Sequence, residues 1–345
     1  MSIFVDIEKN LGAFQLKIKF SADNEVIALL GASGSGKSMT LKCIAGIETP
    51  DRGRIILDGV TLFDSEKKIN LPVQERRTGL LFQNYALFPN MTVWENLEAG
   101  AHREKDAKKR QALVENFLES FGLKNFAQHY PKQLSGGQKQ RVALARILAS
   151  QPKILLLDEP FSALDSHLRF HIEQEVRKII KDFCGTVILV SHDRDEVFRL
   201  ADSLAVLHAG SVETFGTKSE VFAKPRTRQA AILTGCKNIS PLEKISECQA
   251  FAKAWGITLD LDEPVAEAKF LGIRMHDLHP AAEENIFLCQ VQEVIENPFS
   301  YTIMLKAKDG AESFGWEVDK EYWKNFQAEQ IKIGFPKGKI LLFRE

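Results

Sequence analysis

The chain has 345 residues, and at about 150 residues per domain this length predicts two domains. Its 45 Lys and Arg residues nearly balance its 46 Asp and Glu residues, so it lacks the positive excess that general binding to nucleic acid needs, and we expect no nucleic-acid partner. No apolar stretch approaches the ~18 residues of a membrane span, and we do not expect the first ten residues, MSIFVDIEKN, to be a secretory signal. The five cysteines are scattered along the chain, so we expect them to be free thiols in a reducing compartment.

Short apolar runs alternate with helical patterns up to about residue 235, which predicts an α/β domain over residues 1–235. The apolar runs are typical of strands buried on both faces of a parallel sheet. They lie at Val26–Leu30, Ile154–Leu157 and Thr186–Val190. The helical patterns cover Ser38–Ala45, Ala107–Phe121, Gln138–Ala149, His167–Phe183 and Asp193–Ala201.

The segment directly after the first apolar run has the pattern of a phosphate-binding loop. It reads GASGSGKS from Gly31 to Ser38, between an expected strand and an expected helix. Its glycines let backbone N–H groups surround a phosphate, and the helix N-terminus adds the positive end of its dipole. We expect Lys37 to reach the outer phosphates of a nucleotide and the Ser38 hydroxyl to bind Mg²⁺. The expected nucleotide contacts are Gly31, Ala32, Ser33, Gly34, Ser35, Gly36, Lys37, Ser38 and Met39.

Two carboxylates, Asp158 and Glu159, directly follow the apolar run at Ile154–Leu157. A strand that delivers acidic residues at its carboxyl end points them into the crevice where α/β sheets bind ligands. We expect Asp158 to join the Mg²⁺ shell and Glu159 to polarise a water toward the terminal phosphate. His192 follows the run at Thr186–Val190, so we expect it on the same edge of the sheet as Glu159.

The sequence LSGGQKQR, from Leu134 to Arg141, introduces the helical pattern at Gln138–Ala149. Ser135 followed by Gln138 has the spacing of a capping box, so a simple capped helix is one interpretation. The other interpretation is a second anion site at a helix N-terminus. One nucleotide does not need two complete phosphate sites. The second interpretation therefore requires two copies of the chain, arranged head to tail, in which this helix of each copy contacts the nucleotide bound by the other.

Taken together and in this order, Gly31–Ser38, Leu134–Arg141 and Ile154–Glu159 resemble the motifs of the ATP-binding subunits of ABC transporters. The resemblance covers about residues 1–235. It implies a P-loop ABC ATPase domain with a parallel-sheet core and a helical subdomain. It also implies ATP and Mg²⁺ as cofactors, ATP hydrolysis as the activity, a homodimer, and two integral-membrane permease subunits as partners.

The resemblance also implies roles for single residues. Gln83 is similar to the glutamine that binds Mg²⁺ and water and links to the membrane subunits. Asp165, in SALD, is similar to an aspartate at the dimer interface. His192 is similar to the switch histidine that contacts the γ-phosphate, beside Glu159 as the base. The residues similar to those that contact the ATP of the other copy are Ser135, Gly136, Gly137 and Gln138.

Two assignments remain open at this level. Phe14 is the candidate for an aromatic residue that stacks on adenine, although it is equally a plain strand residue and Leu11 is an alternative. The apolar residues between Gln83 and the LSGGQ motif have either of two roles, docking of a transmembrane subunit or core packing. They are Phe88, Met91, Val93 and Trp94.

The pattern changes in the last third of the chain. Residues 236–284 are expected to be a linker and the start of a regulatory region, and residues 285–345 a small β-barrel or sandwich. Turn signals separate its expected strands. These strands are Phe287–Ile295, Tyr301–Ala307, Phe314–Val318, Ile331–Phe335 and Lys339–Phe343. This tail resembles a small all-β domain of the TOBE or Mop type.

One ATP-binding domain followed by a β module is similar to the ATP-binding subunits of bacterial importers. Such a subunit lies at the cytoplasmic face of the membrane and works indirectly with an extracytoplasmic solute-binding protein. Thr234–Ser240, Leu271–His276 and Val294–Ser300 resemble molybdate-importer ATPases first, with sulfate or other solute importers as the alternative. A soluble ABC ATPase without a transport role is a further alternative. Glu283 and Glu284 stand where related barrels that bind oxyanions have a basic pair, which speaks against oxyanion binding by the tail.

Overall fold

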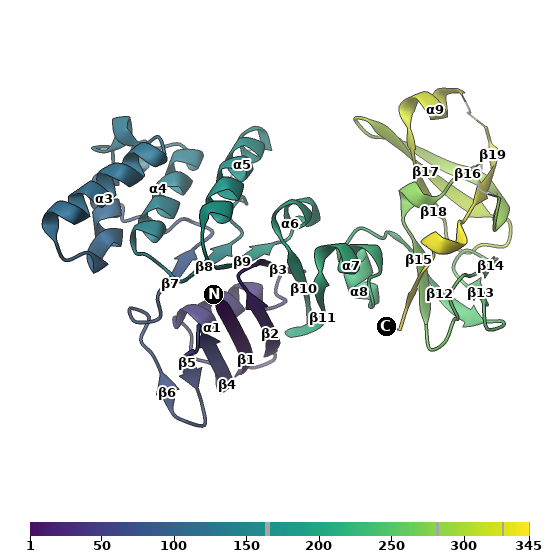
Figure 1. Cartoon of the computed structure of the whole chain (residues 1–345). Coiled ribbons are helices and arrows are strands. Elements are labelled where there is room, and N and C mark those ends of the chain that lie inside the picture. Colours follow the sequence, from purple (N-terminus) through teal and green to yellow (C-terminus); the bar gives the residue numbers. More distant parts are fainter. Residues whose placement is uncertain (163–165, 281–282, 326–327, 345) are drawn as a thin grey trace. The chain divides into compact units, whose positions relative to one another are not determined.

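The computed structural model describes residues 1–162, 166–280, 283–325 and 328–344 (Figure 1). The chain divides into two compact units, Met1–Lys218 and Ser219–Glu345. Asp165 lies outside the described residues. The functional boundaries expected at residues 235 and 284 stay predictions, since compact units need not coincide with functional domains.

In the described part of the first unit, eleven strands form one sheet in the order β6-β5-β4-β1-β2-β11-β10-β3-β9-β8-β7. The strands are β1 (Ser2–Asn10), β2 (Gln15–Asp23), β3 (Val26–Gly31), β4 (Arg52–Leu57), β5 (Val60–Asp64), β6 (Ile69–Asn70), β7 (Thr78–Leu81), β8 (Ile154–Asp158), β9 (Thr186–Ser191), β10 (Ser203–His208) and β11 (Ser211–Thr217). Neighbours from β10 to β7 run parallel, whereas β1, β2, β4, β5 and β6 pair antiparallel. The expected parallel core is confirmed, and an antiparallel part that the sequence analysis did not identify extends it.

The core lies on both faces of the parallel strands, which explains their unbroken apolar runs. Every residue of β8 and β9 is buried. Ile154 and Leu156 belong to the cluster that contains the buried side of helix α1 (Lys37–Ala45), while Leu155 and Leu157 belong to the cluster under helix α5 (Ser166–Asp182). Successive side chains of a strand point to opposite faces, so a strand covered on both sides is apolar throughout.

Three helices form a subdomain with an apolar core of its own. They are α2 (Val93–Gly100), α3 (Ala107–Ser120) and α4 (Gly136–Ala149), and Figure 1 shows α3 beside α4. Their shared core includes Leu97, Val114 and Val142. The helical subdomain that the resemblance implied is therefore confirmed.

The second unit is mostly β-structure. Its strands are β12 (Asn238–Lys244), β13 (Gln249–Ala252), β14 (Ile257–Asp260), β15 (Phe270–Ile273), β16 (Ile286–Glu296), β17 (Ser300–Ala307), β18 (Phe314–Asp319), β19 (Gln330–Gly334) and β20 (Leu341–Phe343). The short helices are α7 (Lys218–Ala223), α8 (Arg228–Leu233) and α9 (Lys320–Asn325). Two antiparallel sheets, β14-β13-β12-β15-β20 and β18-β17-β16-β19, enclose an aromatic core of Trp255, Phe314 and Phe335.

The all-β character expected for the tail is confirmed and is consistent with a TOBE-like domain. All five strands expected after residue 285 are present. Residues 236–284, whose sequence pattern was hard to interpret, form four more strands, and β15 pairs with β20. All five cysteines are free thiols, as expected. Within the described ranges, no helix is both long enough and apolar enough to cross a membrane.

Candidate nucleotide-binding site

Four parallel strands bring the predicted site residues to one edge of the sheet. In register, Leu30 of β3 pairs with Ser191 of β9, Val190 of β9 with Asp158 of β8, and Leu157 of β8 with Leu81 of β7. The phosphate loop, His192, Glu159 and Gln83 each follow one of these carboxyl ends. They therefore share the edge where α/β sheets bind ligands, as the sequence predicts.

The phosphate loop depends on glycines at two points. Gly36 has φ 101°, in the left-handed region, and a Cβ there would stand 2.4 Å from Leu16 Cδ1. A Cβ on Gly31 would stand 2.4 Å from Ser35 Oγ and 2.5 Å from the Leu207 carbonyl oxygen. Only glycine suits these positions, because the first needs an unusual backbone conformation and the second leaves no room for a side chain.

The Lys37 side chain lies inside the loop that it belongs to. Its Nζ donates hydrogen bonds to the carbonyl oxygens of Gly31, at 2.7 Å, and Ala32, at 2.9 Å. Burial lowers the pKa of Lys37, and the nearby charges of Glu159 and Asp158 act against this shift. A buried cation that is hydrogen-bonded to neutral carbonyl groups is stabilised further when an anion takes their place. The ammonium of Lys37 is therefore suited to binding a phosphate.

Ser38 and Asp158 form the part of the site that suits a divalent metal ion. Ser38 Oγ donates to Asp158 Oδ1 at 2.8 Å. Burial raises the pKa of Asp158, and the hydrogen bond from Ser38 opposes that shift. A hydroxyl and a carboxylate in contact are hard oxygen ligands of the kind that Mg²⁺ prefers. The pair therefore fits the ion that the sequence predicts there.

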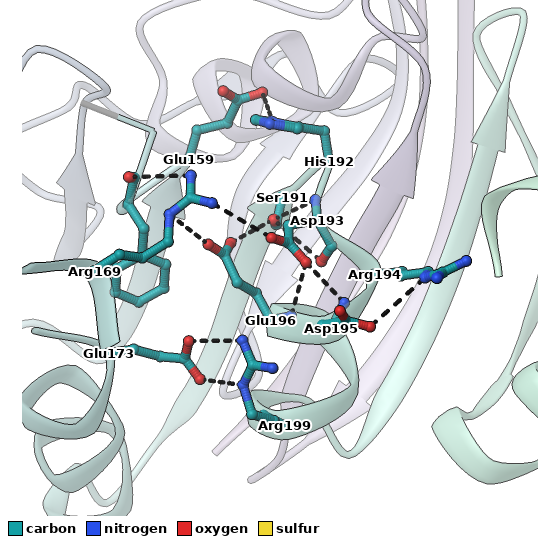
Figure 2. Close-up of polar contacts among 11 residues, drawn as sticks. Glu159, Arg169, Glu173, Ser191, His192, Asp193, Arg194, Asp195, Glu196 and Arg199 are labelled. Carbon is teal, nitrogen blue, oxygen red and sulfur yellow. Dashed lines mark hydrogen bonds and ion pairs between the residues drawn. The ribbon is translucent and has the colours of Figure 1, made fainter. Parts of the chain in front are cut away.

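Glu159 occupies a tight turn directly after β8. Its φ is 46°, its N–H donates to Val190 O at 3.0 Å, and its own carbonyl accepts from the Ser162 hydroxyl at 3.0 Å. Its carboxylate lies between two predicted catalytic side chains: Gln83 Nε2 donates to Oε2 at 3.3 Å, and His192 Nδ1 is 3.4 Å from Oε1. Figure 2 shows the contact with His192. Strained backbone of this kind is typical of functional sites.

The segment that follows Gln83 is held by the helical subdomain. Tyr85 and Ala86 both have positive φ, and Arg146 of α4 donates to their carbonyl oxygens at 3.2 and 2.8 Å. The Arg146 guanidinium also lies 5.0 Å from the centre of the Phe88 ring. Arg146 thus connects helix α4 to the chain two and three residues beyond Gln83.

Ser135 caps helix α4 in a complete capping box. Its Oγ accepts from Gln138 N at 3.4 Å, and Gln138 Oε1 accepts from Ser135 N at 2.8 Å. Gly137 lies where a Cβ would stand 2.5 Å from Ile172 of α5. Among the residues that the structure describes, Ser135–Gln138 make no hydrogen bond with Gly31–Ser38. The first interpretation of this motif is thus seen in the structure, and the second needs another copy of the chain.

The structure distinguishes among the remaining candidates. Phe14 lies against the phosphate loop, with its Cζ 3.3 Å from the position of a Cβ on Gly36, while Leu11 is exposed. Val93 is fully buried in the core of the helical subdomain and Trp94 packs partly against it. The other two apolar candidates of that region are exposed: Phe88 by 45% and Met91 by 38%.

The sequence analysis missed Arg76, a buried guanidinium behind the phosphate loop. Its Nη1 donates to Cys43 O and Ile44 O in the last turn of α1, at 2.9 and 3.0 Å. Its Nε donates to Leu71 O and its Nη2 to Asn70 Oδ1. A cation here stabilises the negative end of the helix whose positive end faces the phosphate. No local pattern marks this arginine, since its partners lie up to 33 residues away.

Comparisons with known proteins agree with this geometry. The family model described as ABC transporter matches residues 15–162, which include the phosphate loop, the LSGGQ motif and Glu159. A solved dimeric ATP-binding cassette in a post-hydrolysis state, bound to ADP and Pi, has a TM-score of 0.54 at 30% identity and covers 63% of this chain and 99% of its own. A second dimeric structure, of a bacterial ABC transporter cassette, has a TM-score of 0.53 over the same shares.

Curated relatives extend the similarity over both units. A sulfate/thiosulfate import ATP-binding protein CysA from Synechococcus elongatus is 37% identical over 319 residues, which are 91% of this chain and 83% of that protein. A CysA from Mesostigma viride is 42% identical over 69% of this chain and 68% of its own length. CysA 1 from Shewanella oneidensis is 34% identical over 99% of this chain and 91% of its own length.

Proposed function

The chain belongs to the ATP-binding subunits of ABC transporters of the import type, and from this premise we propose that it powers the uptake of sulfate or thiosulfate. The expectation put molybdate first and sulfate second. The observation that supports sulfate is the match to sulfate/thiosulfate import proteins across both units, at 91% and 99% of this chain. None of the relatives described above is named for molybdate.

The phosphate loop and Asp158 bind the nucleotide in this proposal. Lys37 exchanges its carbonyl partners for the outer phosphates of ATP, and the loop N–H groups surround them. Ser38, Asp158 and Gln83 would hold Mg²⁺, and the ion would supply charge neutralisation at the phosphates. Phe14, beside Gly36, is the residue that we propose to stack on adenine.

The turn at Glu159 carries the hydrolytic chemistry. Glu159 accepts a proton from the attacking water, and its carboxylate is within reach of both Gln83 and His192. His192 has an exposed side chain, which leaves it free to contact the γ-phosphate. The contact at 3.4 Å lets these two groups orient one another before the nucleotide is cleaved.

We propose a head-to-tail homodimer with ATP at the interface. The similar cassettes are dimeric in their solved structures. Ser135, Gly136, Gly137 and Gln138 at the start of α4 would meet the ATP held by the partner's phosphate loop. Asp165, outside the described residues, is proposed at the same interface.

The exposed apolar residues of the helical subdomain form the proposed docking site for one of the two permease subunits, and the second chain of the homodimer would dock on the other. Phe88 and Met91 are exposed there, and Met91 borders a cavity of about 450 Å³ that is also lined by Glu95, His102 and Arg110. A chain docked in this way lies at the cytoplasmic face of the membrane, opposite an extracytoplasmic solute-binding protein.

We propose that the acidic pair near the start of β16, Glu283 and Glu284, does not bind an oxyanion. Glu284 accepts a hydrogen bond from Lys337 N at 3.2 Å, and its other oxygen is 3.9 Å from Lys337 Nζ. Because the Glu284 carboxylate already offsets the positive charge of Lys337, this part of the second unit attracts an oxyanion only weakly.

Complementation tests the cargo directly. The chain is expressed in a bacterium that lacks its sulfate-import ATPase, and uptake of radiolabelled sulfate is measured beside uptake of molybdate. We expect sulfate uptake to return with the wild-type chain and not with Glu159→Gln, which controls for ATP hydrolysis. Restored molybdate uptake without sulfate uptake would return the assignment to the first expectation.

A further inference from the structure

Two ion pairs join helix α5 to helix α6 (Arg194–Leu200) beneath the catalytic edge, as Figure 2 shows. The first is a bidentate pair in which Arg199 Nε and Nη2 donate to the two carboxylate oxygens of Glu173, at 2.5 and 2.8 Å. Glu173 is buried, and the two residues of this pair belong to the two helices that it joins. It serves below as the comparison for the second pair.

The second ion pair is different because Arg169 also reaches backbone next to Glu159. Its Nη2 donates to the carbonyl oxygen of Phe161 at 3.4 Å, two residues beyond Glu159. Its Nη1 is 3.5 Å from Asp193 Oδ2 and its Nε is 3.4 Å from Glu196 Oε1. One guanidinium thus spans from the turn of Glu159 to the first turn of α6.

Glu196 continues the connection to the residues on both sides of His192. The Ser191 hydroxyl donates to Glu196 Oε2 at 2.7 Å, and the Asp193 N–H donates to Ser191 Oγ at 2.9 Å. Glu196 is 3% exposed, so its carboxylate has little access to water and depends on these partners. The backbone before and after His192 is thereby fixed to the same carboxylate that faces Arg169.

We propose that Arg169 and Glu196 together form a positioning pair that sets the distance between the Glu159 turn and the His192 loop. The inference rests on the proposed roles of Glu159 and His192 in hydrolysis. In this role Arg169 and Glu196 act through Phe161 on one side and through Ser191 and Asp193 on the other.

The geometry favours positioning over simple helix attachment. Arg199 and Glu173 already join α5 to α6 with two short hydrogen bonds. Arg169 Nε and Glu196 Oε1 are both buried and neither makes a hydrogen bond within the described residues, although they face one another at 3.4 Å. The Arg169 guanidinium shares its contacts among Phe161, Asp193 and Glu196, so it joins the chain next to Glu159 to the chain next to His192, which the Arg199–Glu173 pair does not do.

The test compares two double variants of the full chain that each remove one arginine–glutamate pair. They are Arg169→Met/Glu196→Gln and the matched control Arg199→Met/Glu173→Gln. We measure steady-state hydrolysis of MgATP, calorimetric binding of MgATP, thermal unfolding, and the imidazole NMR signal of His192, identified by its loss in His192→Ala. For Arg169→Met/Glu196→Gln we expect kcat to fall at least tenfold, KM and MgATP affinity to stay within twofold, and the His192 signal to shift.

The control variant is expected to unfold at a lower temperature but to keep kcat within twofold and the His192 signal in place. Equal losses of kcat in both double variants, or an unmoved His192 signal in Arg169→Met/Glu196→Gln, would overturn the inference. If Arg169→Met/Glu196→Gln fails to fold while the control variant folds, the pair is structural, and this outcome would overturn the inference as well. A wild-type chain without ATPase activity would refute the proposed function, while the His192 signal would still decide the positioning role.

Discussion

Glu159 Oε1 lies 3.4 Å from His192 Nδ1, although the two residues follow different strands and are separated by helix α5 in the chain. The contact exists because β8 and β9 are parallel neighbours, so their carboxyl ends meet at one edge. A carboxylate and an imidazole at this separation can orient one another and share a proton with a bound water.

Glu159→Gln is expected to keep ATP binding and to lose most turnover. The amide retains the size of the side chain and its place in the turn, but it does not accept a proton from water. We expect kcat to fall by about 10² to 10⁴. Steady-state hydrolysis, with size-exclusion chromatography in ATP to detect a stabilised closed dimer, measures both effects. Turnover close to that of the wild type would place the base elsewhere.

Ser135→Asp is expected to preserve helix α4 and to abolish hydrolysis. Aspartate caps a helix as well as serine does, so the fold should be unaffected. Its negative charge would repel the phosphates of the partner's ATP. Ser135→Asn, which caps without charge, is the matched control and should remain active. If both variants hydrolyse ATP equally, the start of α4 does not meet a nucleotide.

ATPase activity per chain is expected to rise with protein concentration until the dimer is saturated. Each site needs the phosphate loop of one chain and the LSGGQ motif of another, so a monomer holds two incomplete sites. A dilution series of the wild-type chain, assayed at saturating MgATP, measures this dependence. Constant specific activity down to concentrations at which the chain is monomeric would refute the composite site.

Asp158→Asn is expected to stabilise the chain without nucleotide while it removes Mg²⁺-dependent activity. Burial raises the pKa of Asp158 in the folded chain above its ordinary value of 3.8. A raised acid pKa means that the folded state binds a proton more tightly than the unfolded state, so the contribution of Asp158 to stability falls as pH rises from 3.8 through the folded pKa.

Thermal unfolding without nucleotide, from pH 4 to pH 8, checks this prediction. The melting temperature of Asp158→Asn should exceed that of the wild type at neutral pH, and the difference should shrink toward pH 4. A variant that melts below the wild type at pH 7 would mean that the contacts with Ser38 and Lys37 outweigh the burial of the charge.

Arg76→Met is expected to destabilise the first unit by about 3 kcal/mol, because it removes a buried guanidinium that donates to four oxygens. The neighbouring Arg77 is exposed, and among the residues that the structure describes its side chain donates one hydrogen bond, to Gln151 O at 3.2 Å. Arg77→Met is therefore the control, and we expect it to change stability by less than about 0.5 kcal/mol. Urea unfolding of the two variants side by side measures the difference.

The sequence determined the elements whose patterns are local. The sequence allowed the loop Gly31–Ser38 to be placed on the same edge of the sheet as Asp158, Glu159 and His192. Continuous apolar runs indicate parallel strands, and the residues after each strand lie at its carboxyl end. Five helices of the first unit and the last five strands could be anticipated in the same way, whereas helix α2 was not anticipated.

Tertiary structure alone decided the contacts between distant segments. The local sequence does not show that Arg76 binds the end of α1 or that Arg169 lies between Phe161 and Glu196. Nor does it show that Val93 is buried while Met91 is exposed. Local periodicity fixes which face of an element is apolar. It does not fix which polar groups from other segments come within about 3 Å of one another, because that depends on the register and packing of the whole sheet.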